Sequence, residues 1–457
     1  MYSNGIYPPI SLSGSFAIAL QRGTLIKNTS CDVNTTSSCL RIGNPLVVKL
    51  ARAVLELTLF RISIFGFNTM IGISRLYIGK AEASDSLRYS RKPGHSPAQR
   101  KPIVVWNATK RCNLLCQHCY SSSESSLSID NELTTAEAKT FIGDLAKFAV
   151  PVLLFSGGEP LMRQDIPELA KFAVSKGLRA VISTNGTLIN ASMAKKLKDA
   201  GVSYVGISLD GSETVNDKFR EKKGAFAKTI SGIRACNKAG LKVGIRFTIT
   251  KKNYKEVPFI FDLIEKESIQ RACFYHLVCS GRGSDIRKEI LSPEITRKTV
   301  DLIIDRTANL HKRGICTEVL TVDNHCDGPY LYLRMLKENS PRAKEVLDLL
   351  EMTGGNSSGV GIACVSWDGT VYPDQFMRNH PVGNIREKPF SGIWPSKPGE
   401  FLQKLREKHK LVTGRCAKCR FLDVCAGNFR ARTEALTGDL WASDPACYLN
   451  DREIKTR

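Results

Sequence analysis

The chain has 457 residues, of which 42% are hydrophobic and 24% are charged, and its formal net charge at pH 7 is +22. This length and composition suffice for two or more domains with hydrophobic cores, and they exclude a small disulfide-stabilised protein. No apolar run is long enough and free enough of charge to span a bilayer, so we expect no transmembrane span.

The positive charge favours an anionic partner, which could be a nucleic acid, a membrane surface or an acidic small molecule. The sequence contains no RNA- or DNA-binding motif and no single polybasic tail, so we expect no nucleic-acid partner. An acidic substrate fits the charge, and a basic surface without a specific partner fits it equally well. The 15 cysteines cluster in metal-like spacings within a long chain, which predicts a reducing, cytoplasmic location.

The first 69 residues look unlike the rest of the chain. Residues 45–67 are apolar but carry several charges on one helical face, which favours an amphipathic helix over a transmembrane one. A different interpretation is that translation starts at Met70 and that residues 1–69 are not part of the mature protein. Residues 70–101 would then form an N-terminal arm and a basic linker.

Three cysteines, Cys112, Cys116 and Cys119, lie within eight residues directly after an apolar run. Thiolates bind soft metals and iron–sulfur clusters. A cubane cluster has four irons, so three cysteines leave one iron open for a ligand that is not protein. A zinc site that lacks one ligand is the alternative, although zinc sites usually contain C-x₂-C pairs and this spacing is C-x₃-C-x₂-C. We therefore predict a reactive cluster with an open iron.

Apolar runs alternate with amphipathic stretches from residue 101 to about residue 280. This alternation is typical of a parallel sheet with crossover helices, and therefore of an α/β fold. Six repeats with polar residues after the strands favour a partial (β/α)6 TIM-like barrel, whose active site lies at the C-terminal edge of the strands. A doubly wound open sheet is the alternative. The predicted strands are residues 103–106, 152–155, 179–183, 204–208, 243–248 and 273–278, and the predicted helices are residues 134–148, 166–175, 191–199, 226–238, 257–265, 293–313, 330–339 and 341–352.

Polar residues follow several of these predicted strands. Gly157 and Gly158 allow a ligand to approach the backbone closely, and Glu159 offers an acceptor for a cationic amine. Other polar residues at strand ends are candidates for a bound cofactor, although helix capping would explain some of them equally well. These further candidates are Ser183, Asn185, Ser208, Asp210 and Arg246.

A second cysteine group, Cys416, Cys419, Cys425 and Cys447, has the spacing C-x₂-C-x₅-C-x₂₁-C. Four thiolates complete a cluster without an open iron, which would be structural or redox-active. A zinc ribbon is the competing interpretation. Upstream of this group, the Asp-Gly pair at residues 368–369 predicts a tight hairpin between two short strands.

The first cysteine group, with Tyr120 next to its last cysteine, resembles the signature of the radical S-adenosylmethionine (SAM) enzymes. The resemblance implies that SAM chelates the open iron through its amino and carboxylate groups. It also implies that reduction of the cluster releases a 5′-deoxyadenosyl radical, which abstracts a hydrogen atom from the substrate. Residues 102–315 would form the radical SAM core. The implied cofactor contacts are Tyr120, Gly157, Gly158, Glu159, Ser183, Asn185, Ser208, Asp210 and Arg246.

The second cysteine group resembles the outer auxiliary cluster of SPASM/Twitch extensions on radical SAM enzymes, so residues 316–457 would form an auxiliary iron–sulfur domain. Many SPASM proteins hold a second auxiliary cluster, but Asp374 and Phe429 stand here where cysteines often occur. We therefore expect two [4Fe–4S] clusters in total, and we do not expect Cys326 or Cys364 to be ligands.

Longer stretches outside the cysteine groups resemble the tetrapyrrole-modifying radical SAM proteins. The resemblance implies removal of two acetate groups from 12,18-didecarboxysiroheme to give Fe-coproporphyrin III, with ferredoxin or flavodoxin as electron donor. A propionate-removing enzyme of haem d1 biosynthesis and a peptide-modifying SPASM maturase are the alternatives. Arginines would bind the substrate carboxylates and a histidine its iron. The candidates for these contacts are Arg246, Arg282, His118, His276 and His325.

Overall fold

The computed structural model describes residues 70–82, 85, 88–89, 101–395 and 397–455. All of them lie within the second of two units of the chain, Arg61–Arg457. The predictions for residues 1–69 and for most of the basic linker fall outside the described residues. No helix in the part of the chain that the structure describes is both long and apolar enough to cross a membrane.

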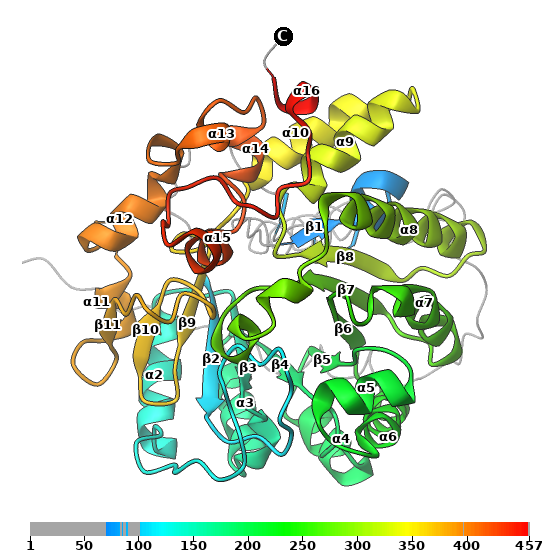
Figure 1. Cartoon of the computed structure of the whole chain (residues 1–457). Helices are drawn as coiled ribbons and strands as arrows, with labels where there is room; N and C mark the ends of the chain where they lie inside the picture. Colours follow the sequence, from blue (N-terminus) through cyan, green and yellow to red (C-terminus); the bar gives the residue numbers. More distant parts are fainter. Residues whose placement is uncertain (1–69, 83–84, 86–87, 90–100, 396, 456–457) are drawn as a thin grey trace, which may run out of the picture. The chain divides into compact units, whose positions relative to one another are not determined.

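All six predicted strands are present, and they lie side by side in the order in which they occur along the chain (Figure 1). Neighbouring strands are parallel throughout this series. A doubly wound sheet would reverse its strand order near the middle, so this order confirms the partial barrel. The strands are β2 (Ile103–Thr109), β3 (Val152–Gly157), β4 (Arg179–Thr184), β5 (Tyr204–Ser208), β6 (Val243–Ile249) and β7 (Arg271–His276).

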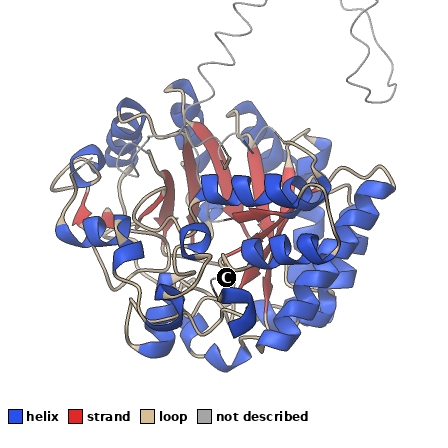
Figure 2. Cartoon of the chain, turned by 90° about the horizontal axis from the view of Figure 1, so that it is seen from above, coloured by secondary structure: helices blue, strands red, loops and turns tan. Residues whose placement is uncertain are grey.

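Helices connect these strands and lie outside the sheet, as the view from above shows (Figure 2). Their ends follow ordinary capping rules: the first begins at a Thr134–Glu137 capping box, and the second has a proline in its first turn. The helices around the barrel are α2 (Thr135–Lys147), α3 (Ile166–Ser175), α4 (Ala191–Asp199), α5 (Glu213–Arg220), α6 (Ala225–Lys238), α7 (Val257–Lys266) and α8 (Pro293–Lys312).

A seventh parallel strand, β8 (Glu318–Val322), pairs with β7 and was not among the predicted strands. The short strand β1 (Met70–Gly72) pairs with it in antiparallel orientation. The buried carboxylate of Glu318 lies at the start of β8 and accepts hydrogen bonds from Arg88 at 2.7 Å and from Arg271 at 2.6 Å. The N-terminal arm is therefore fixed to the end of the barrel opposite the predicted active site.

The C-terminal region continues the sheet beyond β2. The strand β9 (Ile362–Val365) is parallel to β2, and β10 (Thr370–Tyr372) and β11 (Gly383–Asn384) follow in antiparallel orientation. Gly369 has a φ of +85° in the predicted Asp-Gly turn between β9 and β10. The helices of this region are α9 (Asp327–Lys337), α10 (Ala343–Thr353), α11 (Phe390–Ile393), α12 (Glu400–Arg406), α13 (Gly414–Ala417), α14 (Leu422–Cys425), α15 (Arg430–Thr437) and α16 (Asp451–Ile454).

Candidate active site

The first cysteine group lies on the loop that follows β2. Cys112 and Cys116 are buried, and both pack with Leu114 and Ala225 in one small apolar cluster that Cys119 adjoins. Burial raises the pKa of Cys112 to about 12, and the charges of the neighbouring thiols, above all that of Cys116, add to this increase. Three crowded thiols can all ionise only if a cation compensates them, as iron would.

The thiols also meet polar hydrogens from other elements. The backbone N–H of Leu114 donates to Cys112 Sγ at 3.5 Å, and the Arg220 guanidinium donates to Cys116 Sγ at the same distance. Such donors stabilise thiolate ligands of clusters. No three His, Cys, Asp or Glu residues in the described ranges are placed to hold a single metal ion. In a cluster each thiol would bind its own iron.

Gly157 and Gly158 bring β3 close to the loop after β2. A Cβ atom on Gly157, which has a φ of +131°, would lie 2.5 Å from the Thr109 carbonyl oxygen, and one on Gly158 would lie 2.1 Å from that of Arg111. The backbone N–H groups of Gly158 and Glu159 donate to these two carbonyls, each at 2.8 Å. The two glycines therefore allow the turn after β3 to pack closely against the loop after β2. We call this loop, which contains Cys112, Cys116 and Cys119, the cysteine loop.

Glu159 is fully buried, and burial raises the pKa of its carboxyl group to about 7. The carboxylate accepts hydrogen bonds from Thr184 Oγ1 at 2.7 Å and from the backbone N–H groups of Asn185 and Leu161 at 2.8 and 3.1 Å. It therefore holds the ends of β3 and β4 together. A direct contact between Glu159 and a cationic amine stays a prediction.

A cavity of about 140 Å³, the inner cavity, lies at the carboxyl ends of the barrel strands. Ser183, Ser208 and Arg246 line it, and the Arg246 guanidinium donates to Ser183 Oγ at 2.9 Å. Gly206 leaves room for that guanidinium, because a Cβ atom there would lie 2.5 Å from Arg246 Nε. Three of the predicted strand-end residues thus meet in one place.

Asn185 and Asp210 do not line the inner cavity. Asn185 donates to Asn113 Oδ1 at 2.8 Å and lies 4.0 Å from Cys112 Sγ. Asp210 is fully buried and forms an ion pair with Arg220, the residue that donates to Cys116. Both side chains therefore position the cysteine loop.

Arg220 itself was not among the predicted site residues. It lies at the end of α5, a short helix whose sequence is largely polar and which was not among the predicted helices. His118 lies 3.8 Å from the same Asp210 carboxylate and lines the inner cavity, and burial lowers its pKa to about 4. His118 is therefore a neutral imidazole near the cysteine loop.

Three further candidates for substrate contacts, in addition to Arg246 and His118, have different positions. His276 lines the inner cavity, and its Nε2 lies 2.9 Å from the Asp327 carboxylate. His325 is buried against Phe429 and lines no cavity described for the chain. Arg282 donates to the carbonyl oxygens of Cys116 and Ser123, each at 3.0 Å, and so fixes the cysteine loop. A contact between Arg282 and a substrate carboxylate stays a prediction.

The four thiols of the second group lie close together around α13, α14 and the segment before α16. Burial raises the pKa of Cys425 above its usual range, and the charges of the other three thiols, above all that of Cys447, add to this increase. The Arg415 guanidinium donates to Cys447 Sγ at 3.6 Å, and the backbone N–H of Phe421 donates to Cys419 Sγ at 3.4 Å. Four thiols with such donors fit a closed cluster.

Cys326 lies next to this group, where a hydrogen bond with its side chain lowers the pKa of Cys447 to about 7. Cys364 is buried in β9. Asp374 accepts hydrogen bonds from the backbone N–H groups of Phe376 and Met377 at 2.7 and 2.8 Å. Phe429 packs against the ring of Phe376, with the centroids 5.5 Å apart. Asp374 and Phe429 therefore both stabilise the turn after β10.

Two family models match the chain. The Radical SAM superfamily matches residues 106–264, and the SPASM iron–sulfur cluster-binding domain matches residues 358–420. Fe-coproporphyrin III synthase from Methanosarcina barkeri is 56% identical over 395 residues, which cover 84% of this chain and 99% of the relative. The chain belongs to the radical SAM superfamily. It is a radical SAM enzyme, and its cofactors are SAM and [4Fe–4S] clusters, of which the SPASM architecture fits two.

Other relatives and solved structures of this family agree. Pre-heme d1 synthase from Dinoroseobacter shibae is 40% identical over 375 residues, covering 81% of this chain and 92% of that protein. Streptococcus suis SuiB bound to S-adenosylmethionine has a TM-score of 0.60 at 18% identity, covering 76% of this chain and 78% of that chain. Native anSMEcpe with bound AdoMet has a TM-score of 0.58 at 20% identity, covering 76% and 94%. These structures share the fold of a radical SAM core with a SPASM region.

Proposed function

We propose that this radical SAM enzyme is an Fe-coproporphyrin III synthase, which removes two acetate side chains from 12,18-didecarboxysiroheme. The observation that carries the proposal is the 56% identity to the Methanosarcina barkeri enzyme over almost its entire length. The 40% identity to pre-heme d1 synthase supports a tetrapyrrole as the class of substrate and makes propionate removal the second candidate.

We propose that Cys112, Cys116 and Cys119 hold the cluster with the open iron. SAM bound to such a cluster supplies, on reduction, a carbon radical able to abstract a hydrogen atom from an unactivated C–H bond. Leu114 N–H and Arg220 stabilise the thiolates, and Arg282 holds the loop that carries them. The side chains that would hold SAM are those of Tyr120, Ser183, Ser208 and Arg246 at the inner cavity, with Gly157, Gly158, Glu159, Asn185 and Asp210 shaping the surrounding loops.

We propose that Cys416, Cys419, Cys425 and Cys447 hold the auxiliary cluster. Their segment is joined to the inner cavity through a buried carboxylate: Tyr448 donates to Asp327 Oδ1 at 2.6 Å, and Asp327 Oδ2 lies 2.9 Å from His276. His276 is therefore placed to contact the part of a substrate that reaches the inner cavity, and such a contact is part of this proposal.

The remaining assignments follow the same plan. Residues 70–101 act as an N-terminal arm, residues 102–315 as the radical SAM core, and residues 316–457 as the auxiliary region, whose first strand extends the barrel sheet. A ferredoxin or flavodoxin fits as electron donor, because such acidic proteins complement a chain of net charge +22. A cytoplasmic location suits a protein with unpaired cluster cysteines.

The test is turnover by the full chain after anaerobic reconstitution of its clusters. The enzyme is incubated with SAM, a reductant and 12,18-didecarboxysiroheme, and the tetrapyrrole product is identified by mass spectrometry. We expect the loss of both acetate groups and the appearance of Fe-coproporphyrin III. Loss of propionate groups would favour the haem d1 branch, and SAM cleavage without any change in the tetrapyrrole would overturn the proposal.

A further inference from the structure

A second cavity, of about 610 Å³, lies outside the inner cavity, and we call it the outer cavity. It is lined by five segments: the cysteine loop, the turn after β7, the turn between β9 and β10, the turn after β10, and α15. Its volume falls within the range of about 300–1,000 Å³ that is typical of small-molecule sites, whereas the inner cavity falls below that range. In this structure the inner cavity can therefore take only part of a ligand.

Tyr120 and Phe376 line both cavities and mark the place where the two meet. Their rings pack edge to face with centroids 5.3 Å apart. Tyr120 donates to Asn107 Oδ1 at 2.8 Å, and Ser280 Oγ donates to the carbonyl oxygen of Phe376 at 3.1 Å. Both rings are thus fixed, and a ligand in the outer cavity that extends past them reaches the inner cavity.

Three basic side chains line the outer cavity: Lys110, Arg287 and Arg378. None of them forms an ion pair with another residue that the structure describes. Glu434 is the one acid among the described lining residues, and it is bound to His380 at 2.7 Å. The cavity therefore has an excess of positive charge that the chain itself does not neutralise.

Arg378 is held in place but incompletely bonded. Its guanidinium lies over the rings of Trp367 and Tyr372, at 4.9 and 5.2 Å from their centroids, and its Nη2 donates to Ser366 Oγ at 3.1 Å. Its Nη1 is buried and has no hydrogen-bond partner among the described residues. A buried donor without a partner is unfavourable, so this geometry is suited to an acceptor that a ligand supplies.

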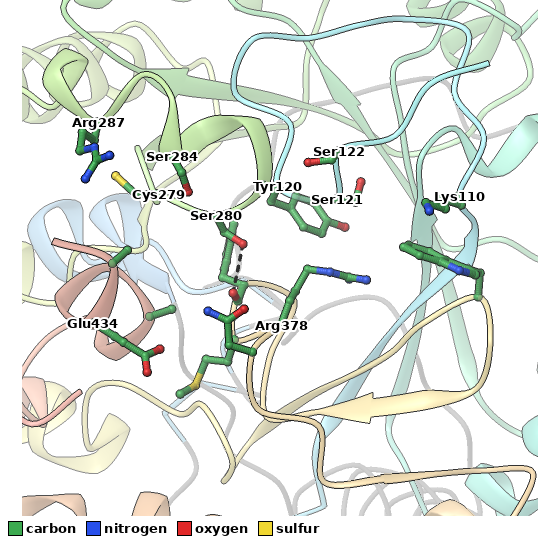
Figure 3. A pocket seen from close by; sticks show the side chains of 17 residues that line it. Lys110, Tyr120, Ser121, Ser122, Cys279, Ser280, Ser284, Arg287, Arg378 and Glu434 are labelled. Atoms are coloured by element: carbon green, nitrogen blue, oxygen red, sulfur yellow. Dashed lines mark hydrogen bonds between the residues drawn. The ribbon is translucent and has the colours of Figure 1, made fainter. Parts of the chain in front are cut away.

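The basic side chains surround the cavity instead of meeting at one point. Figure 3 shows Arg287 and Lys110 on opposite sides of the view, with Tyr120 and Arg378 between them. A ligand with a single carboxylate would need only one of these cations. A flat macrocycle that carries several carboxylates around its edge can use all three, and its faces can pack on fixed aromatic rings.

We propose that the outer cavity binds the tetrapyrrole, with Arg378, Lys110 and Arg287 as the residues that bind its carboxylates. Tyr120, Phe376 and Trp367 then contact the macrocycle, and the reacting acetate group extends past the Tyr120–Phe376 pair toward Arg246 and Ser183. The inference rests on the proposed function and deepens it, because it assigns substrate contacts to residues outside the barrel strands.

The test is binding of Fe-coproporphyrin III, a tetracarboxylate, to the cluster-loaded full chain without SAM or reductant. The Kd is measured from the change in the absorbance of the porphyrin. We expect Arg378→Met to raise the Kd about tenfold or more, and Arg287→Met to raise it by a smaller factor. Arg378→Lys should bind with intermediate strength, because lysine keeps the charge and loses the bidentate geometry. The matched control is Arg386→Met, since Arg386 pairs with Glu137 and lies outside the outer cavity, and its Kd should not change.

A second probe separates charge recognition from packing. The tetramethyl ester of the same iron porphyrin should bind wild type more weakly and should not distinguish wild type from Arg378→Met. Iron content and melting temperature verify that each variant is folded, and Arg287 is exposed, so its replacement keeps the test valid if Arg378→Met is unstable. If wild type binds the porphyrin and both variants bind it equally well, this inference is overturned and the proposed function stands. If wild type does not bind the porphyrin at all, the proposed function fails with it.

Discussion

The two cysteine groups differ in the number of thiols and in what surrounds them. The first has three thiols on one loop, and Arg282 and Arg220 fix that loop beside the inner cavity. The second has four thiols drawn from separate short segments. No thiol of either group lines the inner or the outer cavity, but His118 and Tyr120, the neighbours of Cys119 in the first group, line the inner cavity. A missing ligand next to a cavity indicates chemistry on a bound molecule, whereas a complete set away from the cavities indicates electron transfer or structural support.

Each group is nevertheless linked to the inner cavity by one buried aspartate. Asp210 pairs with Arg220, which donates to Cys116, and Asp327 joins His276 to Tyr448, the neighbour of Cys447. The Asp210 link ends on the thiol of Cys116, whereas the Asp327 link ends on Tyr448, the neighbour of Cys447. Disturbing each link separately should therefore affect one cluster and spare the other.

The largest expected effect comes from removing one thiol of each group. Cys116→Ala should lower SAM cleavage below detection, whereas Cys419→Ala should retain SAM cleavage and lose tetrapyrrole turnover. Each variant should contain about four fewer irons per chain than wild type, because a cubane cluster holds four. The measurements are 5′-deoxyadenosine by chromatography and iron by colorimetry. SAM cleavage by Cys116→Ala would contradict the assignment of the first group.

The next effect is on stability at the first link. Arg220→Met leaves Asp210 buried without its cation, which should lower the free energy of unfolding by about 3–5 kcal/mol. Arg234→Met is the matched control, because Arg234 is largely exposed and pairs with Glu267, and its loss should change stability much less than Arg220→Met does. Anaerobic urea denaturation compares the two. Equal losses would mean that the Asp210–Arg220 pair has no special role.

Glu159 should make stability depend on pH. Burial raises the pKa of Glu159 to about 7, so the folded chain holds this proton more tightly than the unfolded chain does. The protonated Glu159 contributes fully to the stability of the fold below the unfolded pKa of about 4.5. This contribution, of up to about 3 kcal/mol, is lost as the pH rises to about 7. The melting temperature of wild type should therefore fall over this pH interval relative to that of Glu159→Gln. Parallel curves for the two proteins would refute the shift.

The smallest effect should come from the donor at the second group. Arg415→Met removes a cationic donor from Cys447, so the auxiliary cluster should become harder to reduce. We expect its potential to fall by no more than about 60 mV, a factor of ten for a one-electron couple. An EPR-monitored redox titration resolves the two clusters, and the potential of the first should stay unchanged. A shift confined to the first cluster would contradict the separation of the two groups.

The barrel could be predicted from the sequence because its strands are continuous apolar runs and its helices are amphipathic. The strand β8 was not, since it begins with a buried glutamate whose charge is compensated by the distant Arg88, Lys242 and Arg271. The helix α5 was missed because its buried face contains the polar residues Asn216 and Arg220, which are bonded to Asp210 in the loop before the helix.

The site shows the same limit. Local spacing identified the cysteines and the glycine-rich turn, because each depends on residues that are close in sequence. Arg282 and the outer cavity depend on contacts between segments that are far apart in the sequence, which no local pattern records. Cys236, Cys273, Cys279 and Cys316 stand in apolar or helical stretches of the sequence, which predicts that all four are core residues. The first three are buried, whereas Cys316 is exposed before β8, so that prediction is wrong for Cys316.

The most direct test of the account is the product formed by the reconstituted full chain, counted against the SAM that it consumes. The account predicts conversion of 12,18-didecarboxysiroheme to Fe-coproporphyrin III, with one molecule of 5′-deoxyadenosine formed for each acetate group removed. Mass spectrometry of the tetrapyrrole and chromatography of 5′-deoxyadenosine in the same sample give both numbers. An unchanged tetrapyrrole in a sample that has consumed SAM, or a product that lacks propionate groups and keeps its acetates, would contradict it.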